Sequence, residues 1–243
     1  MDARVAAQRA IDNARLPSGS DERFAGYGVM GLPFASGHVL ALRRFAASSL
    51  GPGYTSVWHR DANERWTFWQ DVPPAQACPR YFGAAIAEAH QCEIEVSWPG
   101  PNALSVRIPG ELEWDLSFTS TPIASAMNAI ASLVPDPLWR NAAFLTLMEG
   151  VAGVALGAGR IGMRGSAPNR QRFIANPQRI WFVSKTRAVV RGEDLGPMGR
   201  LTQQARLADF WIPQRGILAI GRAFFEPLDT AVHVSATSRA GAR

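Results

Sequence analysis

Alternation of apolar and polar residues is clearest between residues 91 and 118. In three successive segments, apolar side chains recur at every second position and polar ones fill the positions between them. Tight turns that contain proline and glycine separate the segments, at residues 99–102 and 109–110. A period of two is typical of strands with one buried face, so this region predicts an antiparallel meander.

Other parts of the chain predict further strands, because they are rich in β-branched and aromatic residues. Residues 53–60 and 65–72 flank a polar break at 61–64, which is the pattern of a β-hairpin. The remaining predicted strands lie at residues 38–45, 159–165, 170–176, 179–185, 187–192, 205–213 and 215–226.

A helical hairpin interrupts the predicted strands between residues 120 and 157. Thr121 can cap a helix that starts at Pro122, and prolines end this helix after residue 134. Residues 138–156 predict a second, largely apolar helix. A membrane span needs about 20 uninterrupted apolar residues, so we expect this helix to cover a cavity or to lie at a membrane surface.

The whole pattern predicts a mainly β fold: an antiparallel β-barrel or a two-sheet lipocalin-like fold with the helical hairpin inserted mid-chain. Closure or stacking of about ten strands would hide their edges. We expect an N-terminal arm or short helix at residues 1–24, a single β-rich domain at 25–227 with the helical insertion at 120–157, and a flexible tail at 228–243.

The net charge of +5 is distributed unevenly along the 243 residues. Residues 1–158 carry 11 basic and 15 acidic groups, a net of −4, whereas residues 159–243 carry 14 basic and 5 acidic groups, a net of +9. The arginines of the basic part are dispersed and accompany no nucleic-acid motif, so no nucleic-acid partner is expected. We expect acidic and basic strands to lie side by side, with any anionic ligand group held among the arginines.

Composition and motif spacing point to no cofactor and no metal. The four histidines and two cysteines lack ligand spacing. The segment GAGRIG at 157–162 is not followed by a helix-forming sequence, as a dinucleotide site requires. No secretory signal opens the chain, and 24 of its 25 basic residues are arginine, as in GC-rich bacteria. A cytoplasmic bacterial protein with reduced thiols is expected.

Aromatic side chains on the predicted strands supply the candidate binding site, because a barrel interior lined by tryptophan can hold an apolar molecule. The same side chains could equally be ordinary core residues. The candidate substrate-binding residues are Trp58, Trp69, Trp114, Arg107, Trp181 and Trp211.

Four titratable residues are candidates for proton transfer: His59, Asp61, Asp115 and Asp209. His59 and Asp61 lie at the rim of the predicted hairpin, and Asp209 lies between apolar neighbours on a strand. Asp115 belongs to the polar face of the meander, which either faces solvent or lines a cavity. The register of the sheet decides between these alternatives.

The segments SVWHRDANERWTFW and GELEWDLSF, within residues 25–118, resemble the lipocalin-related carotenoid 1,2-hydratases (hydroxyneurosporene synthases). The resemblance implies a calyx for an apolar, terpenoid or lipid-like molecule. It also implies hydration or cyclisation chemistry without a cofactor.

The expected function is therefore binding of an apolar, terpenoid or lipid-like molecule in a barrel cavity. Cofactor-independent acid–base chemistry (hydration, isomerisation or cyclisation) would follow, as in a lyase or isomerase. One alternative is a non-catalytic carrier of a fatty-acid-like ligand whose carboxylate pairs with an arginine. Another is a membrane-surface protein that uses residues 138–156 for peripheral contact.

Overall fold

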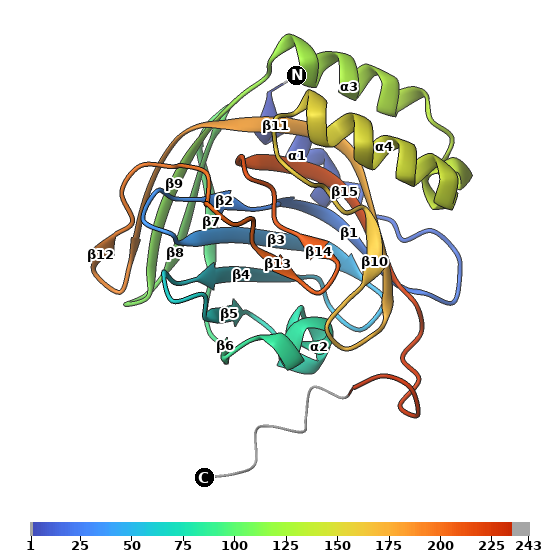
Figure 1. The fold of residues 1–243 in the computed structure, drawn as a ribbon, viewed down its shortest axis with the longest axis horizontal. Coiled ribbons are helices and arrows are strands. Elements are labelled where there is room, and N and C mark those ends of the chain that lie inside the picture. Colours follow the sequence, from blue (N-terminus) through green and yellow to red (C-terminus); the bar gives the residue numbers. More distant parts are fainter. Residues whose placement is uncertain (1, 235–243) are drawn as a thin grey trace.

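The computed structural model describes residues 2–234 and shows a large, strongly curved β-sheet covered on one side by a pair of helices (Figure 1). The helices are α1 (Ala3–Asp12), α2 (Pro79–Phe82), α3 (Pro122–Leu133) and α4 (Ala142–Ala155), with short 3₁₀ helices η1 (Pro74–Gln76), η2 (Gly83–Ala85) and η3 (Asp136–Arg140). The strands of the first half are β1 (Glu22–Val29), β2 (Leu32–Pro33), β3 (Val39–Ser48), β4 (Tyr54–Arg60), β5 (Trp66–Gln70), β6 (Glu88–Gln91), β7 (Glu95–Gly100), β8 (Ala103–Ile108) and β9 (Leu112–Thr119). Those of the second half are β10 (Arg164–Ser166), β11 (Arg172–Val190), β12 (Glu193–Asp194), β13 (Arg206–Leu207), β14 (Phe210–Trp211) and β15 (Ile217–Phe225).

The main sheet is mixed and open. Its strand order is β6-β5-β4-β3-β1-β15-β11-β9-β8-β7, with β2, β10 and β12 paired at the side, while β13 and β14 form a separate ribbon. Every neighbouring pair is antiparallel except β5 with β6, which is parallel. Within residues 2–234 no ladder joins the end strands β6 and β7.

The prediction of a closed barrel is therefore wrong, although the prediction of a mainly β fold with a helical hairpin is confirmed. The physical reason lies in the edge strands, which are protected without closure. Strand β6 has four residues, with Glu88 and His90 among them, and β7 ends at Pro99 and Gly100. Short, charged or proline-containing edges resist pairing with another strand.

The predicted meander is confirmed as β7, β8 and β9. In β9 the even-numbered residues are buried and the odd-numbered ones face solvent to varying degrees. The polar face carries cross-strand ion pairs, with 2.7 Å between Arg107 Nη2 and Asp115 Oδ1 and 3.9 Å between Arg187 Nη1 and Glu113 Oε2. Acidic β9 and basic β11 are neighbours, so the uneven charge is partly neutralised between adjacent strands.

Three strands predicted at 170–176, 179–185 and 187–192 are one continuous strand, β11. Pro177 separates the first two predicted segments, but in the structure it lies at a bulge where the register to β15 shifts between Pro177 and Arg179. A bulge tolerates a residue without an N–H, so the strand bends there and continues.

The interior of the curved sheet is a packed core. Trp69, Trp114 and Trp181 lie there with apolar residues from both ends of the sheet, and Ala3 and Ala7 of α1 pack against the same cluster. Each of these side chains is buried. These tryptophans fill the interior of the sheet, which is where the predicted barrel would hold its ligand.

The helical hairpin begins as the sequence predicts. The Thr121 hydroxyl accepts a hydrogen bond from the Ala124 N–H at 3.2 Å, and Pro122 is the first residue of α3. Among the residues described, no helix combines the length and apolar character needed to cross a bilayer.

The two terminal segments are tied to the sheet. The predicted arm contains α1 and the first residues of β1. At the other end, the Val234 N–H donates to the Asn169 carbonyl at 3.0 Å, and His233 Nε2 lies 3.2 Å from Glu226 Oε1. The rest of the predicted tail, residues 235–243, lies outside the described residues.

Candidate functional site

An apolar cavity of about 150 Å³ lies between the outer face of the sheet and the helical hairpin. Residues of β1, β3, β11 and β15 form its floor, including Gly26, Ile180 and Ala219. The roof comes from α3, η3, α4 and the residue after it: Met127, Ala131, Trp139, Met148, Ala152 and Leu156. A site of this kind, mostly apolar with a few polar groups, is typical of small-molecule binding.

Arg43 on β3 lines this cavity and is a buried charged residue, only 5% exposed. Successive residues of a strand point to opposite faces, so Arg43 shares a face with Val39 and Ala41 while Arg44 points to the other side. No sequence motif marks Arg43, and only its neighbours in the chain point to it. Its signal is that residues 39–42 are apolar at every position, which indicates a strand buried on both faces. An arginine that follows directly must then be buried or partly buried.

The Arg43 guanidinium is held by backbone carbonyls and aromatic rings. Nη1 donates to the Val29 carbonyl at 2.7 Å and to the Leu42 carbonyl at 2.9 Å, and Nη2 donates to the Met30 carbonyl at 3.1 Å. Its Cζ lies 4.5 Å from the ring centroid of Trp58 and 5.6 Å from that of Phe210. These contacts account for three of the five N–H groups of an arginine, and they fix its orientation.

The charge of Arg43 is not balanced by a carboxylate. Within residues 2–234 no aspartate or glutamate lies within ion-pair distance of its guanidinium. Burial lowers the pKa of Arg43 to about 10, so the group is still protonated at neutral pH. Burial also raises the pKa values of its neighbours Tyr54 and Cys78, which are therefore uncharged at that pH. A buried cation without a counter-ion carries a desolvation penalty of several kcal/mol.

Further buried polar groups continue across the sheet from Arg43. Arg43 pairs with Ser56 of β4, which pairs with Gln70 of β5, so the three residues form a row on one face. Ser56 Oγ, both Gln70 amide atoms and Trp58 Nε1 are buried and have no hydrogen-bond partner among the described residues. Buried polar atoms are normally paired, so this row is an unusual feature of the buried face that carries Arg43.

Of the predicted substrate-binding residues, Trp211 lines the cavity and Trp58 contacts Arg43. Trp69, Trp114 and Trp181 instead belong to the core on the opposite side of the sheet. Arg107 lies on the solvent face of the meander.

The structure does not bring the four predicted proton-transfer residues together. Asp115 pairs with Arg107 on the meander, and Asp61 accepts a hydrogen bond from the Arg65 N–H within its own turn. Asp209 is exposed and accepts from the Ser166 N–H at 2.9 Å. His59 is buried, but it faces the core on the opposite side of the sheet from Arg43 and Trp58.

His59 forms a buried pair with His38. His38 Nδ1 and His59 Nε2 are 2.9 Å apart, and the two rings stack with their centroids 5.2 Å apart. Burial, and then the proximity of His38, lower the pKa of His59 to about 4. His59 is therefore neutral at pH 7, and one imidazole of the pair donates to the other.

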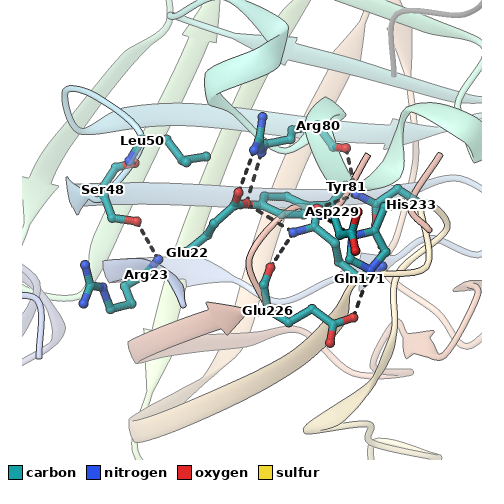
Figure 2. Close-up of polar contacts among 12 residues, drawn as sticks. Glu22, Arg23, Ser48, Leu50, Arg80, Tyr81, Gln171, Glu226, Asp229 and His233 are labelled. Carbon is teal, nitrogen blue, oxygen red and sulfur yellow. Dashed lines mark hydrogen bonds and ion pairs between the residues drawn. The ribbon is translucent and has the colours of Figure 1, made fainter. Parts of the chain in front are cut away.

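A second polar cluster surrounds Glu22 at the start of β1 (Figure 2). Arg80 of α2 donates to both carboxylate oxygens, at 3.0 and 2.6 Å, and the Tyr81 hydroxyl donates to Oε2. Gln171 joins the cluster from the segment before β11, at 3.4 Å from Oε2, and also donates to the Glu226 carbonyl. The carboxylate of Glu22 is thus satisfied within the protein, which is the arrangement of a structural tie rather than of a ligand site.

Glu22→Gln is expected to lower the free energy of unfolding at pH 7 by ~1.5 kcal/mol, because it removes charge-assisted hydrogen bonds at a buried position. Burial alone would raise the pKa of Glu22, but its hydrogen bonds to Arg80 and Tyr81 and the Arg80 charge outweigh it and hold the pKa below 4.5. The contribution is present above about pH 4.5 and disappears as the pH falls through the lowered pKa. Urea titrations at several pH values measure it.

Glu113→Gln is the matched control, since Glu113 forms an exposed ion pair with Arg187. This change is expected to alter stability by less than about 0.5 kcal/mol. Equal effects of the two substitutions would contradict the assignment of Glu22 as a structural tie.

Comparison with known proteins shows a distant likeness in fold. No family model and no curated protein matches the chain. The fold is similar to a crystal structure of acetoacetate decarboxylase from Legionella pneumophila subsp. pneumophila str. Philadelphia 1. The TM-score is 0.41 and the sequence identity 9%, over 90% of this chain and 89% of the other.

The resemblance to the carotenoid 1,2-hydratases and the lipocalin-like barrel that it implied are corrected by these findings. No family model matches the chain, and its sheet is open between β6 and β7 within the described residues, so it forms no lipocalin-like calyx. The tryptophans of the two segments that carried the resemblance also divide between opposite faces of the sheet: Trp58 lies on one, Trp69 and Trp114 on the other.

Proposed function

We propose that the protein binds a small, largely apolar molecule with a carboxylate in the cavity beneath the helical hairpin. The observation that carries this proposal is Arg43, a buried cation without a carboxylate partner among the described residues, in the wall of an apolar cavity. A ligand carboxylate would balance its charge and accept charge-assisted hydrogen bonds from the two N–H groups that the backbone carbonyls leave.

The cavity limits the size of this ligand. An engineered protein cavity of about 150 Å³ with an apolar lining admits benzene, so a volume of about 150 Å³ fits a single ring or a short branched chain. A long fatty-acid chain or a terpenoid exceeds this volume. The proposed ligand is therefore acidic, like that of the expected fatty-acid carrier, but smaller than a fatty acid.

The proposed role of this cavity is binding alone. The lining residues described include no aspartate, glutamate, histidine, lysine or cysteine. Besides apolar contacts, the wall supplies two arginines, Arg43 and Arg222, and the amides of Asn128, Asn176 and Gln178. The single lysine of the chain, Lys185, is exposed on β11. His59 faces the opposite core, where it pairs with His38.

Benzoate and benzamide test the proposal, because they have nearly the same shape and only benzoate is an anion. Benzoate is expected to raise the melting temperature, with a stabilisation of about 2.7 kcal/mol at a hundredfold excess over its Kd. Benzamide at the same concentration should give a much smaller shift. Equal shifts, or no shift with either compound, would contradict the proposed role of Arg43.

A further inference from the structure

The helical hairpin exposes large apolar side chains on its outer surface, away from the cavity. Figure 1 shows α3 and α4 at the outer edge of the molecule, across the end of the sheet. We call the following residues the outer stripe; they are between 39% and 87% exposed: Ile123, Ile130, Leu133, Leu138, Leu147, Val151 and Val154.

The outer stripe is not explained by packing within the chain. In α4, residues 147, 151 and 154 follow helical spacing on one face, while Leu145, Ala152 and the adjoining Leu156 are buried on the other side. Helices at the surface of a globular protein normally carry polar residues on the outer face. Large apolar side chains exposed in this number on one hairpin are typical of an interaction site.

Exposed arginines border the outer stripe at the end of α4. Arg160 and Arg200 line a surface hollow together with Val154, and Arg164 donates to the Thr146 hydroxyl at 2.6 Å. All three arginines are exposed, and among the described residues none of them forms an ion pair with a carboxylate. Glu149 is the acidic residue of this region, and its Oε1 is already bonded to the Met163 and Arg164 N–H groups.

We infer that the outer stripe and its three arginines form a docking surface for an anionic phospholipid bilayer. The apolar side chains would enter the boundary between headgroups and acyl chains, as those of interfacial helices do, and the arginines would pair with lipid phosphates. The complementary charge favours this occupant over a second copy of the chain, whose identical surface would present the same arginines. The inference is independent of what the cavity binds.

Sedimentation with lipid vesicles tests the docking surface. Wild-type protein is expected to bind phosphatidylcholine vesicles that contain about one third phosphatidylglycerol at least tenfold more tightly than vesicles of phosphatidylcholine alone. The double variant Leu133→Ser/Val154→Ser should bind the anionic vesicles about tenfold more weakly, because these two side chains are 82% and 87% exposed and contribute to no core. The variant Arg160→Gln/Arg200→Gln should lose the preference for anionic vesicles.

Val232→Ser is the matched control, since Val232 is 58% exposed at a distance in sequence from the hairpin. It should bind vesicles as the wild type does, and far-ultraviolet circular dichroism confirms that each variant is folded. The inference is overturned if the wild type does not bind anionic vesicles, or if Leu133→Ser/Val154→Ser leaves binding unchanged. If the wild type binds no vesicles but is a dimer in light scattering, and Leu133→Ser/Val154→Ser is a monomer, the outer stripe contacts a second copy of the chain instead.

Discussion

Arg43→Met is expected to weaken benzoate binding by about a hundredfold or more while the weak binding of benzamide stays unchanged. The substitution keeps an apolar stem against Trp58 and Phe210 but removes the buried charge. A carboxylate in the cavity would then be desolvated without a partner, whereas a neutral amide loses little. Isothermal titration calorimetry with the two compounds measures the difference directly.

Arg44→Met is the control for this experiment. Arg44 neighbours Arg43 in the chain, points to the other face of the sheet and donates to the Thr55 hydroxyl at 3.0 Å. Its replacement should leave benzoate binding within about twofold of the wild type. If Arg43→Met weakens benzoate and benzamide to the same extent, the residue acts by shaping the cavity and the proposal of a carboxylate partner is wrong.

His59→Asn is expected to make the stability of the protein less dependent on pH between 7 and 5. In the unfolded chain a histidine takes up its proton near pH 6.5, whereas burial and the proximity of His38 hold the pKa of His59 at about 4 in the folded protein. The unfolded state therefore binds more protons between these values, and the free energy of unfolding falls as the pH falls. The lowered pKa of His59 therefore reduces the free energy of unfolding by ~2 kcal/mol at pH 5 and by ~3 kcal/mol at pH 4.

Urea titrations at pH 7, 6 and 5 check this expectation. His90→Asn serves as the control because His90 is exposed on β6 and hydrogen-bonds Glu88 at 3.0 Å. The wild type and the His90 variant should lose about 2 kcal/mol between pH 7 and 5, and the His59 variant clearly less. Identical slopes for all three proteins would show that the His38–His59 pair does not control the acid sensitivity.

Local patterns in the sequence predict those elements whose structure depends mainly on their own residues and little on contacts with distant segments. The alternation in residues 91–118 fixed the meander, and Thr121 with Pro122 marked the start of α3. Strand β11 could not be predicted as one element, because Pro177 is tolerated only by a bulge that depends on its pairing with β15. Whether the sheet closes depends likewise on whether its two end strands pair with each other. Such pairing is a long-range contact that local patterns do not determine.

The candidate site was predictable only in part. Trp211 and Trp58 were identified by their aromatic character, but the face on which a strand residue lies depends on register. A shift of one residue would exchange Arg43 with Arg44, and it would also exchange Trp58 with His59. Aromatic content alone therefore could not separate the tryptophans that fill the inner core from those near the cavity.

A crystal structure of the protein soaked with 4-bromobenzoate would show directly whether a carboxylate in the cavity meets Arg43. We expect an anomalous bromine peak among the roof residues Met127, Met148 and Ala152, with the carboxylate within hydrogen-bond distance of the Arg43 guanidinium. The same soak of Arg43→Met crystals should give no peak there. Bromine bound with its carboxylate turned away from Arg43, or a cavity that stays without bromine in the wild type, would contradict the account.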